Sequence, residues 1–169
     1  PVALSPSLVP RSVAPDESRR VCEDGEMLGA AAAIFNNAGQ VCTAGSRLFL
    51  ESPVFDAVVT GVADIARDLR VGHGMDPQSQ MGPLISAVHR DRVLDYLDSG
   101  VEEGAELLCG GHSFGDGYFV EPTVLVRATR KMRAVREEIF GPVVAAMPFD
   151  DVPAAIGAAN DIKYGLSGS

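Results

Sequence analysis

The sequence predicts an α/β fold in which a mostly parallel β-sheet is flanked by helices and is incomplete at both ends of the chain. Short apolar segments of strand length alternate with segments of helix length, and the connections between them are long enough for crossovers. A chain of 169 residues, of which 46% are hydrophobic, can also bury a core. Because residues 164–169 resemble the start of a further element, we expect the chain to be a piece of a longer fold.

The chain divides into an irregular lead-in over residues 1–22 and a domain over residues 23–169. The first twenty residues carry four prolines and four serines and show no sustained periodicity, so they predict no regular element. The first helix is predicted from Glu23 to Asn36. Carboxylates in its first turn precede a run of alanines, and this order of charge complements the helix dipole.

A short strand and a second helix follow. Residues Arg47 to Glu51 (RLFLE) predict the strand. Ser52 and Pro53 predict an N-cap with proline in the first helical position, opening a helix that runs to about Leu69. Its buried face is predicted to hold four apolar side chains. These are Val58, Val62, Ile65 and Leu69.

The middle of the chain predicts a loop, a helix and a strand. Residues 72–83 are rich in glycine and proline and predict the loop. Ser86 begins an amphipathic helix that runs to about Gly104, with Val93, Leu94 and Leu97 facing inward. Ala105 to Cys109 then predicts a strand.

The last third of the chain predicts two β segments and a helix. Tyr118 to Val126 is rich in β-forming residues, but Pro122 favours an edge position or a bend, so this segment could pair differently from a parallel strand. Val143 to Phe149 predicts a strand, and Val152 to Asn160 predicts a helix.

Charge and hydropathy exclude two classes of partner. The formal net charge is −9, whereas nucleic-acid binding needs clustered Lys and Arg. The longest uncharged apolar run, Leu28 to Phe35, is far short of the roughly 20 residues of a membrane helix. We therefore expect a soluble globular protein without nucleic-acid or membrane partners, in which any attraction of anionic ligands is local.

The three cysteines, Cys22, Cys42 and Cys109, form no disulfide framework and show no CxxC spacing. A reducing compartment is therefore expected, and the cytoplasm is the predicted location. A zinc site is not expected, and no metal ligand is assigned. Cys42 differs from the other two because a polar loop surrounds it, with Asn36, Asn37, Gly39 and Gln40 nearby in sequence. A thiol in such a loop can ionise and meet a substrate.

Five segments occur in a fixed order and carry a family resemblance. They read FNNAGQVCTAGSR (35–47), MGPLIS (81–86), GYFVEPTVL (117–125), REEIFGPVV (136–144) and NDIKYGLSGS (160–169). Together they resemble the catalytic domain of the NAD(P)-dependent aldehyde dehydrogenase superfamily, over about residues 29–169. The resemblance implies a partial catalytic domain at 23–169, with the cofactor domain and the C-terminal oligomerisation segment absent. It also implies a homodimer or homotetramer in the full-length protein.

By this resemblance the parent protein oxidises an aldehyde to a carboxylic acid with NAD or NADP. Cys42 matches the family nucleophile, which forms a thiohemiacetal and then a thioester, and backbone N–H groups around it are expected to form part of an oxyanion hole. Glu138 matches the glutamate that contacts the nicotinamide ribose, and Phe140 matches the phenylalanine that packs beside the nicotinamide end. The aldehyde itself and the choice between NAD and NADP are not predicted.

The same residues are also compatible with plain structural roles. Cysteine is most often a small buried residue, and Glu137 and Glu138 could be solvated charges before a Gly-Pro turn, with Phe140 in the core. His89 and Arg92 lie in a segment that approaches the cofactor in relatives, but a solvated helix face is the prediction for both. No function is predicted for the other cysteines or for the remaining histidines, which are His73 and His112.

The sequence departs from the family pattern in one respect. The family normally carries a general base in a Glu-Leu-Gly-Gly segment upstream of the nucleophile, at a separation that reaches Leu8 here, and no such segment occurs. Two other hypotheses therefore stay open beside that of an aldehyde dehydrogenase that forms a free acid. One is a catalytically inactive fragment or pseudo-enzyme with an assembly role. The other is an acylating dehydrogenase that passes its thioester to coenzyme A.

Overall fold

The computed structural model describes residues 25–168, so the predicted lead-in and the first residues of the predicted first helix lie outside the described part. The helices are α2 (Gly25–Phe35), α3 (Phe55–Asp68), α4 (Ala87–Glu102), α5 (Arg133–Arg136) and α6 (Val152–Asn160), with the 3₁₀ helices η2 (Asn36–Gly39) and η3 (Ser52–Val54). The strands are β1 (Arg47–Glu51), β2 (Glu106–Cys109), β3 (Ser113–Phe114), β4 (Phe119–Val120), β5 (Thr123–Val126) and β6 (Val143–Phe149).

The main sheet has the strand order β1-β6-β5-β2. Strand β6 pairs in parallel with both β1 and β5, whereas β2 pairs with β5 in the antiparallel sense. Strands β3 and β4 form a separate antiparallel pair. The predicted α/β fold with a mostly parallel sheet is therefore confirmed, with one antiparallel strand at an edge.

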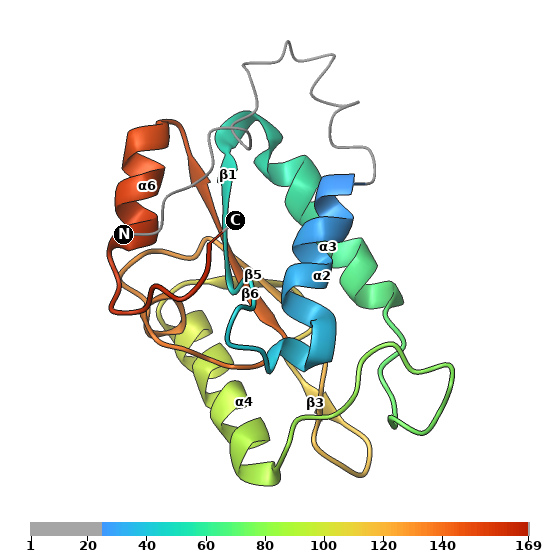
Figure 1. Ribbon diagram of the computed structural model, residues 1–169. Helices are drawn as coiled ribbons and strands as arrows, with labels where there is room; N and C mark the ends of the chain where they lie inside the picture. The colour runs from blue at the N-terminus through green and yellow to red at the C-terminus, as the bar shows by residue number, and fades with distance from the viewer. Residues whose placement is uncertain (1–24, 169) are drawn as a thin grey trace.

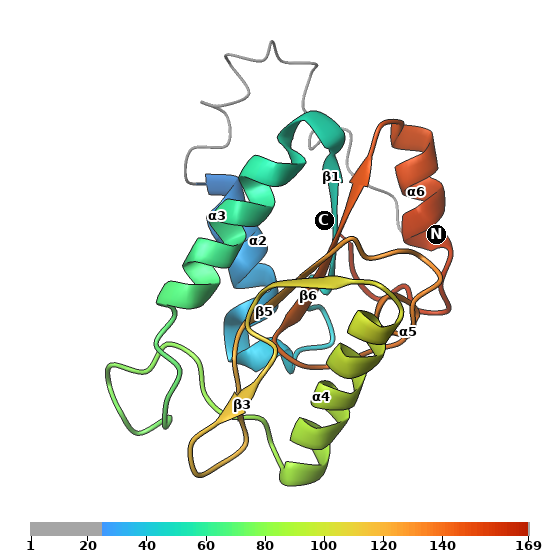
Figure 2. The same ribbon diagram turned by 180° about the vertical axis from the view of Figure 1, so that it is seen from behind.

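Helices cover both faces of the sheet. Figures 1 and 2 show α2 and α3 on one side of it and α4 and α6 on the other. The two central strands are buried on both faces, as expected for strands sandwiched between helix layers. Their largest fully buried apolar side chains are Val124, Leu125, Val143 and Val144. The layered core fixes the ends of β5 and β6, which carry two of the five segments identified in the sequence.

Helices α4 and α6 start at residues whose side chains cap them, whereas α3 and α5 have no side-chain cap. The Ser86 side chain accepts a hydrogen bond from the backbone N–H of His89 (3.2 Å), as its predicted role in α4 requires. The predicted N-cap at Ser52 was wrong. Its hydroxyl instead donates to the carbonyl of Phe149 (3.3 Å), residues Ser52–Val54 form a 3₁₀ turn, and α3 begins only at Phe55.

The remaining differences concern short elements and partial burial. In α3, Val58 and Val62 are buried as predicted, while Ile65 and Leu69 are only partly buried. The predicted β segment at 118–126 divides at Pro122 into β4 and β5, in accord with the bend expected there. The single-turn helix α5 was not predicted, because four residues are too few to show a helical period.

Candidate active site

The loop that carries Cys42 begins where α2 ends. Ile34 and Phe35 are buried and anchor the last turn of α2, and the chain then takes left-handed backbone angles at Asn37 (φ 52°), Ala38 (φ 54°) and Gly39 (φ 67°). Such angles are uncommon outside glycine and persist only where the surroundings hold them. The turn ends the helix abruptly and places the thiol of Cys42 at the surface, where it is exposed.

Close backbone packing joins this loop to the Gly-Pro turn at 141–142. A Cβ atom at Gly39 would collide with the carbonyl group of Gly141 and touch the nitrogen of Pro142. Only glycine allows the two backbones to approach so closely, and Gly39 also needs its positive φ. The cysteine loop therefore lies directly against the turn that follows Glu138 and Phe140.

Gln40 joins the cysteine loop to a third segment, residues 81–86. Its Oε1 accepts a hydrogen bond from the backbone N–H of Ile85 (2.9 Å), and its Nε2 donates to the carbonyl of Pro83 (3.4 Å). Sequence reasoning treated Gln40 only as part of a polar loop. The available signal in the sequence was a glutamine directly after a turn glycine. Its side-chain amide can satisfy both a backbone donor and a backbone acceptor of another segment.

We expect Gln40→Ala to lower the free energy of unfolding of the whole protein by about 1–2 kcal/mol, because the N–H of Ile85 and the carbonyl of Pro83 lose their side-chain partner. Urea unfolding followed by circular dichroism measures the change. Gln78→Ala is the matched control, since the hydrogen bonds of Gln78 use only its backbone. Equal effects of the two substitutions would contradict the bridging role of Gln40.

Two further backbone hydrogen bonds complete the link between segments. The N–H of Leu84 donates to the carbonyl of Tyr118 (2.9 Å), and the N–H of Thr123 donates to the carbonyl of Pro142 (2.8 Å). Four of the five segments therefore meet in one place. The fifth contributes Lys163 to a neighbouring surface, which also includes Glu137.

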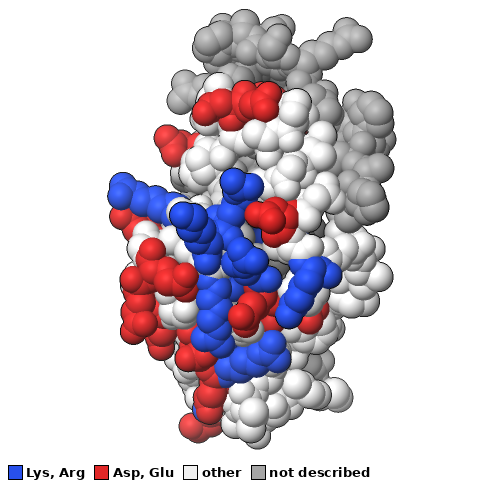
Figure 3. All heavy atoms as spheres, turned by 90° about the vertical axis from the view of Figure 1, so that its left-hand side faces the viewer, with Lys and Arg blue, Asp and Glu red and all other residues white. Residues whose placement is uncertain are grey.

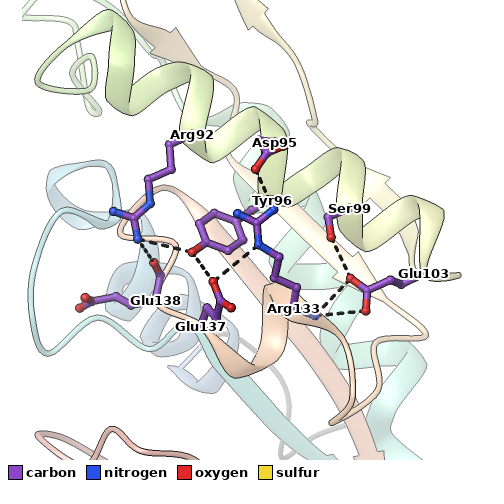
Figure 4. Close-up of polar contacts among 8 residues, drawn as sticks. All are labelled: Arg92, Asp95, Tyr96, Ser99, Glu103, Arg133, Glu137 and Glu138. Atoms are coloured by element: carbon purple, nitrogen blue, oxygen red, sulfur yellow. Dashed lines mark hydrogen bonds and ion pairs between the residues drawn. The ribbon is translucent and has the colours of Figure 1, made fainter.

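The adjacent carboxylates of Glu137 and Glu138 have different surroundings. The hydroxyl of Tyr96 donates to Oε2 of Glu137 (2.9 Å), and the guanidinium of Arg133 lies 3.6 Å from the same oxygen (Figure 4). The hydrogen bond from Tyr96, and then the charges of Arg133 and Lys163, hold the pKa of Glu137 below its usual value. Glu138 is also exposed, but no hydrogen bond within residues 25–168 reaches its carboxylate, which points away from the others in Figure 4.

Phe140 directly precedes the Gly141-Pro142 turn that packs against the Cys42 loop. It is half-buried, and its φ of 59° is a strained value for a residue with a side chain. A ring nitrogen of His89 lies 2.6 Å from the Phe140 carbonyl oxygen, and Arg92 donates to the carbonyl of Glu138 (3.0 Å). The solvated role predicted for His89 was therefore wrong, because its side chain is half-buried, whereas Arg92 is exposed as predicted. Both side chains hold the backbone of the 138–140 segment, and their helical spacing did not reveal the partner.

The other cysteine and histidine residues have ordinary surroundings. Cys109 is buried, and burial raises the pKa of its thiol. His73 and His112 are exposed, in agreement with the prediction, and His73 packs edge-on against Phe119. Cys22 lies outside the described residues.

Basic side chains gather on one face of this acidic chain (Figure 3). A pocket of about 480 Å³ on the protein is lined by four of them and by the carboxylates of Glu103 and Glu137. The four are Lys131, Arg133, Arg136 and Lys163. The surface next to Glu137 and Glu138 is thus locally positive, as attraction of an anionic ligand would require.

Two negative observations apply to residues 25–168. None of the helices in this range has the length and apolar character needed to cross a bilayer. Within the same range, no three side chains of His, Cys, Asp or Glu are grouped so that they could hold a metal ion.

Comparisons with known proteins agree with the motifs. Residues 24–169 match the model of the aldehyde dehydrogenase family. Phenylacetaldehyde dehydrogenase of Pseudomonas fluorescens is 42% identical over 144 residues, which are 83% of this chain and 29% of that protein. This chain therefore spans about 30% of the length of the curated relatives it matches.

Solved structures extend the similarity to the fold. The NAD+ complex of aldehyde dehydrogenase from Bacillus cereus matches with a TM-score of 0.82 at 42% identity, over 84% of this chain and 29% of that chain. A double mutant of betaine aldehyde dehydrogenase from Staphylococcus aureus, in complex with NAD+ and with a BME-modified cysteine, matches with a TM-score of 0.81 at 37% identity, over 85% and 30%. The resemblance seen in the five segments is thereby confirmed: the chain belongs to the aldehyde dehydrogenase family.

Proposed function

We propose that the whole protein containing this chain oxidises an aldehyde to a carboxylic acid with NAD+ or NADP+, and that Cys42 is the nucleophile. The observation that carries the proposal is the exposed thiol in a loop packed against the turn that follows Glu138 and Phe140. A buried cysteine, or one remote from that turn, would have had no access to a shared site. Cys109, which is buried, serves as the internal contrast.

In the proposed reaction the Cys42 thiolate attacks the aldehyde carbon. A carbon–sulfur bond forms, and the electron pair of the carbonyl double bond moves to oxygen, giving a thiohemiacetal anion. The backbone N–H groups of Cys42 and Thr43 have no hydrogen-bond acceptor within residues 25–168, so they are available to that oxyanion. Hydride loss from the same carbon leaves a thioester on Cys42, and attack of water on it releases the carboxylic acid and the thiol.

The bound nicotinamide would supply the acceptor for the hydride. The residues present fit such a group: the Glu138 carboxylate is exposed and free of hydrogen bonds from the described residues, and it can accept from ribose hydroxyls. Phe140, two positions further along the chain, is half-buried. The basic pocket beside Glu137 favours the approach of a ligand that carries phosphate groups.

The remaining features of the whole protein are proposed from family membership. We infer an aldehyde as the small-molecule substrate, a homodimer or homotetramer as the assembly, and the cytoplasm as the location. We also propose that the partial catalytic domain spans residues 23–169, after a lead-in at 1–22. Phenylacetaldehyde and betaine aldehyde, the substrates named for relatives, are the first candidates to test.

The test is an assay of the purified whole protein with NAD+ or NADP+ and each candidate aldehyde. Production of reduced cofactor together with the carboxylic acid is the expected result. If product forms only when coenzyme A is present and is recovered as acyl-CoA, the enzyme is an acylating dehydrogenase and does not release the free acid. No reduced cofactor with any of a broad panel of aldehydes would favour the inactive fragment or pseudo-enzyme.

A further inference from the structure

Tyr96 links helix α4 to the segment that carries Glu138. Its side chain is 2% exposed, and its hydroxyl donates to Oε2 of Glu137 (2.9 Å) while lying 3.4 Å from a guanidinium nitrogen of Arg92 (Figure 4). Cations also lie near its ring, with the guanidinium carbons of Arg92 and Arg133 5.6 Å and 4.3 Å from the ring centroid. Tyr96 is therefore a buried side chain with a hydrogen-bonded carboxylate at its hydroxyl and two guanidinium groups near its ring.

Arg133 provides the second contact to Glu137 and is itself fixed. Its guanidinium lies 2.7 Å from a carboxylate oxygen of Asp95, and its backbone N–H is 3.2 Å from both carboxylate oxygens of Glu103. Glu103 is in turn held by the hydroxyl of Ser99 (2.8 Å). Glu137 is therefore attached to α4 both directly, through Tyr96, and through an anchored arginine.

Three side chains of α4 bind three residues of the 137–140 segment, which carries Glu138 and Phe140. His89 meets the Phe140 carbonyl, Arg92 meets the Glu138 carbonyl, and Tyr96 meets the Glu137 carboxylate. The three residues are separated by three and four positions, so they share one face of α4. The Glu138 carboxylate, by contrast, accepts no hydrogen bond from the described residues.

We propose that Tyr96 is a positioning residue which, by holding Glu137, fixes where the neighbouring Glu138 carboxylate and the Phe140 backbone meet the nicotinamide cofactor. The proposal rests on the proposed function of the whole protein. Tyr96 is too deeply buried to touch the cofactor itself, so it acts through Glu137. Without the hydroxyl, the 137–140 segment loses one of its three side-chain contacts to α4 and samples more positions before it binds the cofactor.

The test uses Tyr96→Phe in the whole protein, because phenylalanine keeps the ring and its burial and removes only the hydroxyl. We expect KM for NAD+ to rise about 3- to 30-fold, because only part of the free energy of a hydrogen bond to a charged group is passed on to cofactor binding, with kcat changed by less than about twofold. Tyr118→Phe is the matched control, since Tyr118 is 42% exposed and uses only its backbone carbonyl. It should leave KM unchanged.

A double-mutant cycle with Glu137→Ala separates positioning from general packing. If Tyr96 acts through Glu137, Tyr96→Phe should have no further effect on KM in the Glu137→Ala background. NMR titration adds a readout that packing alone would not move: the pKa of Glu137 should rise in Tyr96→Phe, with Arg133 and Lys163 still lowering it in part.

The outcomes separate this inference from the proposed function. An active wild-type protein whose Tyr96→Phe variant keeps its KM for NAD+, or whose two substitutions have additive effects, would overturn the positioning role alone. A wild-type protein that neither binds NAD+ nor oxidises any aldehyde would overturn the proposed function, and this inference with it.

Discussion

Cys42→Ala is expected to abolish aldehyde oxidation by the whole protein, with a loss in kcat of at least about 10³-fold. The substitution removes the atom that forms the covalent intermediate, and no other described cysteine can replace it, because Cys109 is buried on β2. Steady-state production of reduced cofactor measures the loss. Binding of NAD+ should be retained, since alanine removes only the thiol and leaves Glu138 and Phe140 unchanged.

Cys109→Ala is the matched control for this substitution. It removes a thiol of the same kind from the core, where burial raises its pKa and disfavours the reactive thiolate. We expect a small loss of stability and unchanged kcat. Full activity of Cys42→Ala, or a comparable loss of kcat in Cys109→Ala at a temperature where both variants are folded, would reject Cys42 as the nucleophile.

Gly39→Ala is expected to cost more stability than any other single-methyl addition in the Cys42 loop. The new Cβ would meet the carbonyl of Gly141, which is backbone and cannot rotate away, and alanine would also have to adopt a φ of 67°. We expect the free energy of unfolding to fall by more than about 3 kcal/mol, or the protein to fail to fold. Urea unfolding, or the yield of folded protein, measures this.

Gly74→Ala provides the comparison, because nothing lies within 4 Å of a Cβ at Gly74 and its φ is not in the left-handed region. Its effect should stay within about 0.5 kcal/mol. In any folded Gly39→Ala protein, kcat should fall as well, since the Cys42 loop must move away from the turn at 141–142. A Gly39→Ala protein as stable and active as the Gly74→Ala protein would show that the two segments do not need their close approach.

Regular elements were predictable where local pattern and tertiary environment agree. Strands β1 and β6 and helix α6 have the predicted bounds, because each combines a clear apolar run with turn or capping residues at its ends. Ser52 shows where local pattern fails. Its hydroxyl has a tertiary partner in the Phe149 carbonyl, and this contact is available only after β1 and β6 have paired.

The residues of the candidate site also differ in whether the sequence alone could predict them. Cys42, Glu138 and Phe140 could be named from the sequence because they lie in motifs whose order identifies the family. Gln40 and Tyr96 could not, because their partners lie 45 and 41 positions away along the chain. The contacts around a candidate site are set by the fold, so a single sequence points to candidate reacting groups more readily than to the residues packed around them.

Mapping the site of covalent modification tests the central claim most directly. The active whole protein would be treated with a limiting amount of an aldehyde-mimicking electrophile, and the modified peptide identified by mass spectrometry. Modification at Cys42 in step with loss of activity is the expected result, since this thiol is exposed and lies beside the turn at 141–142. Preferential modification of Cys22 or Cys109, with Cys42 intact in inactivated protein, would contradict the account.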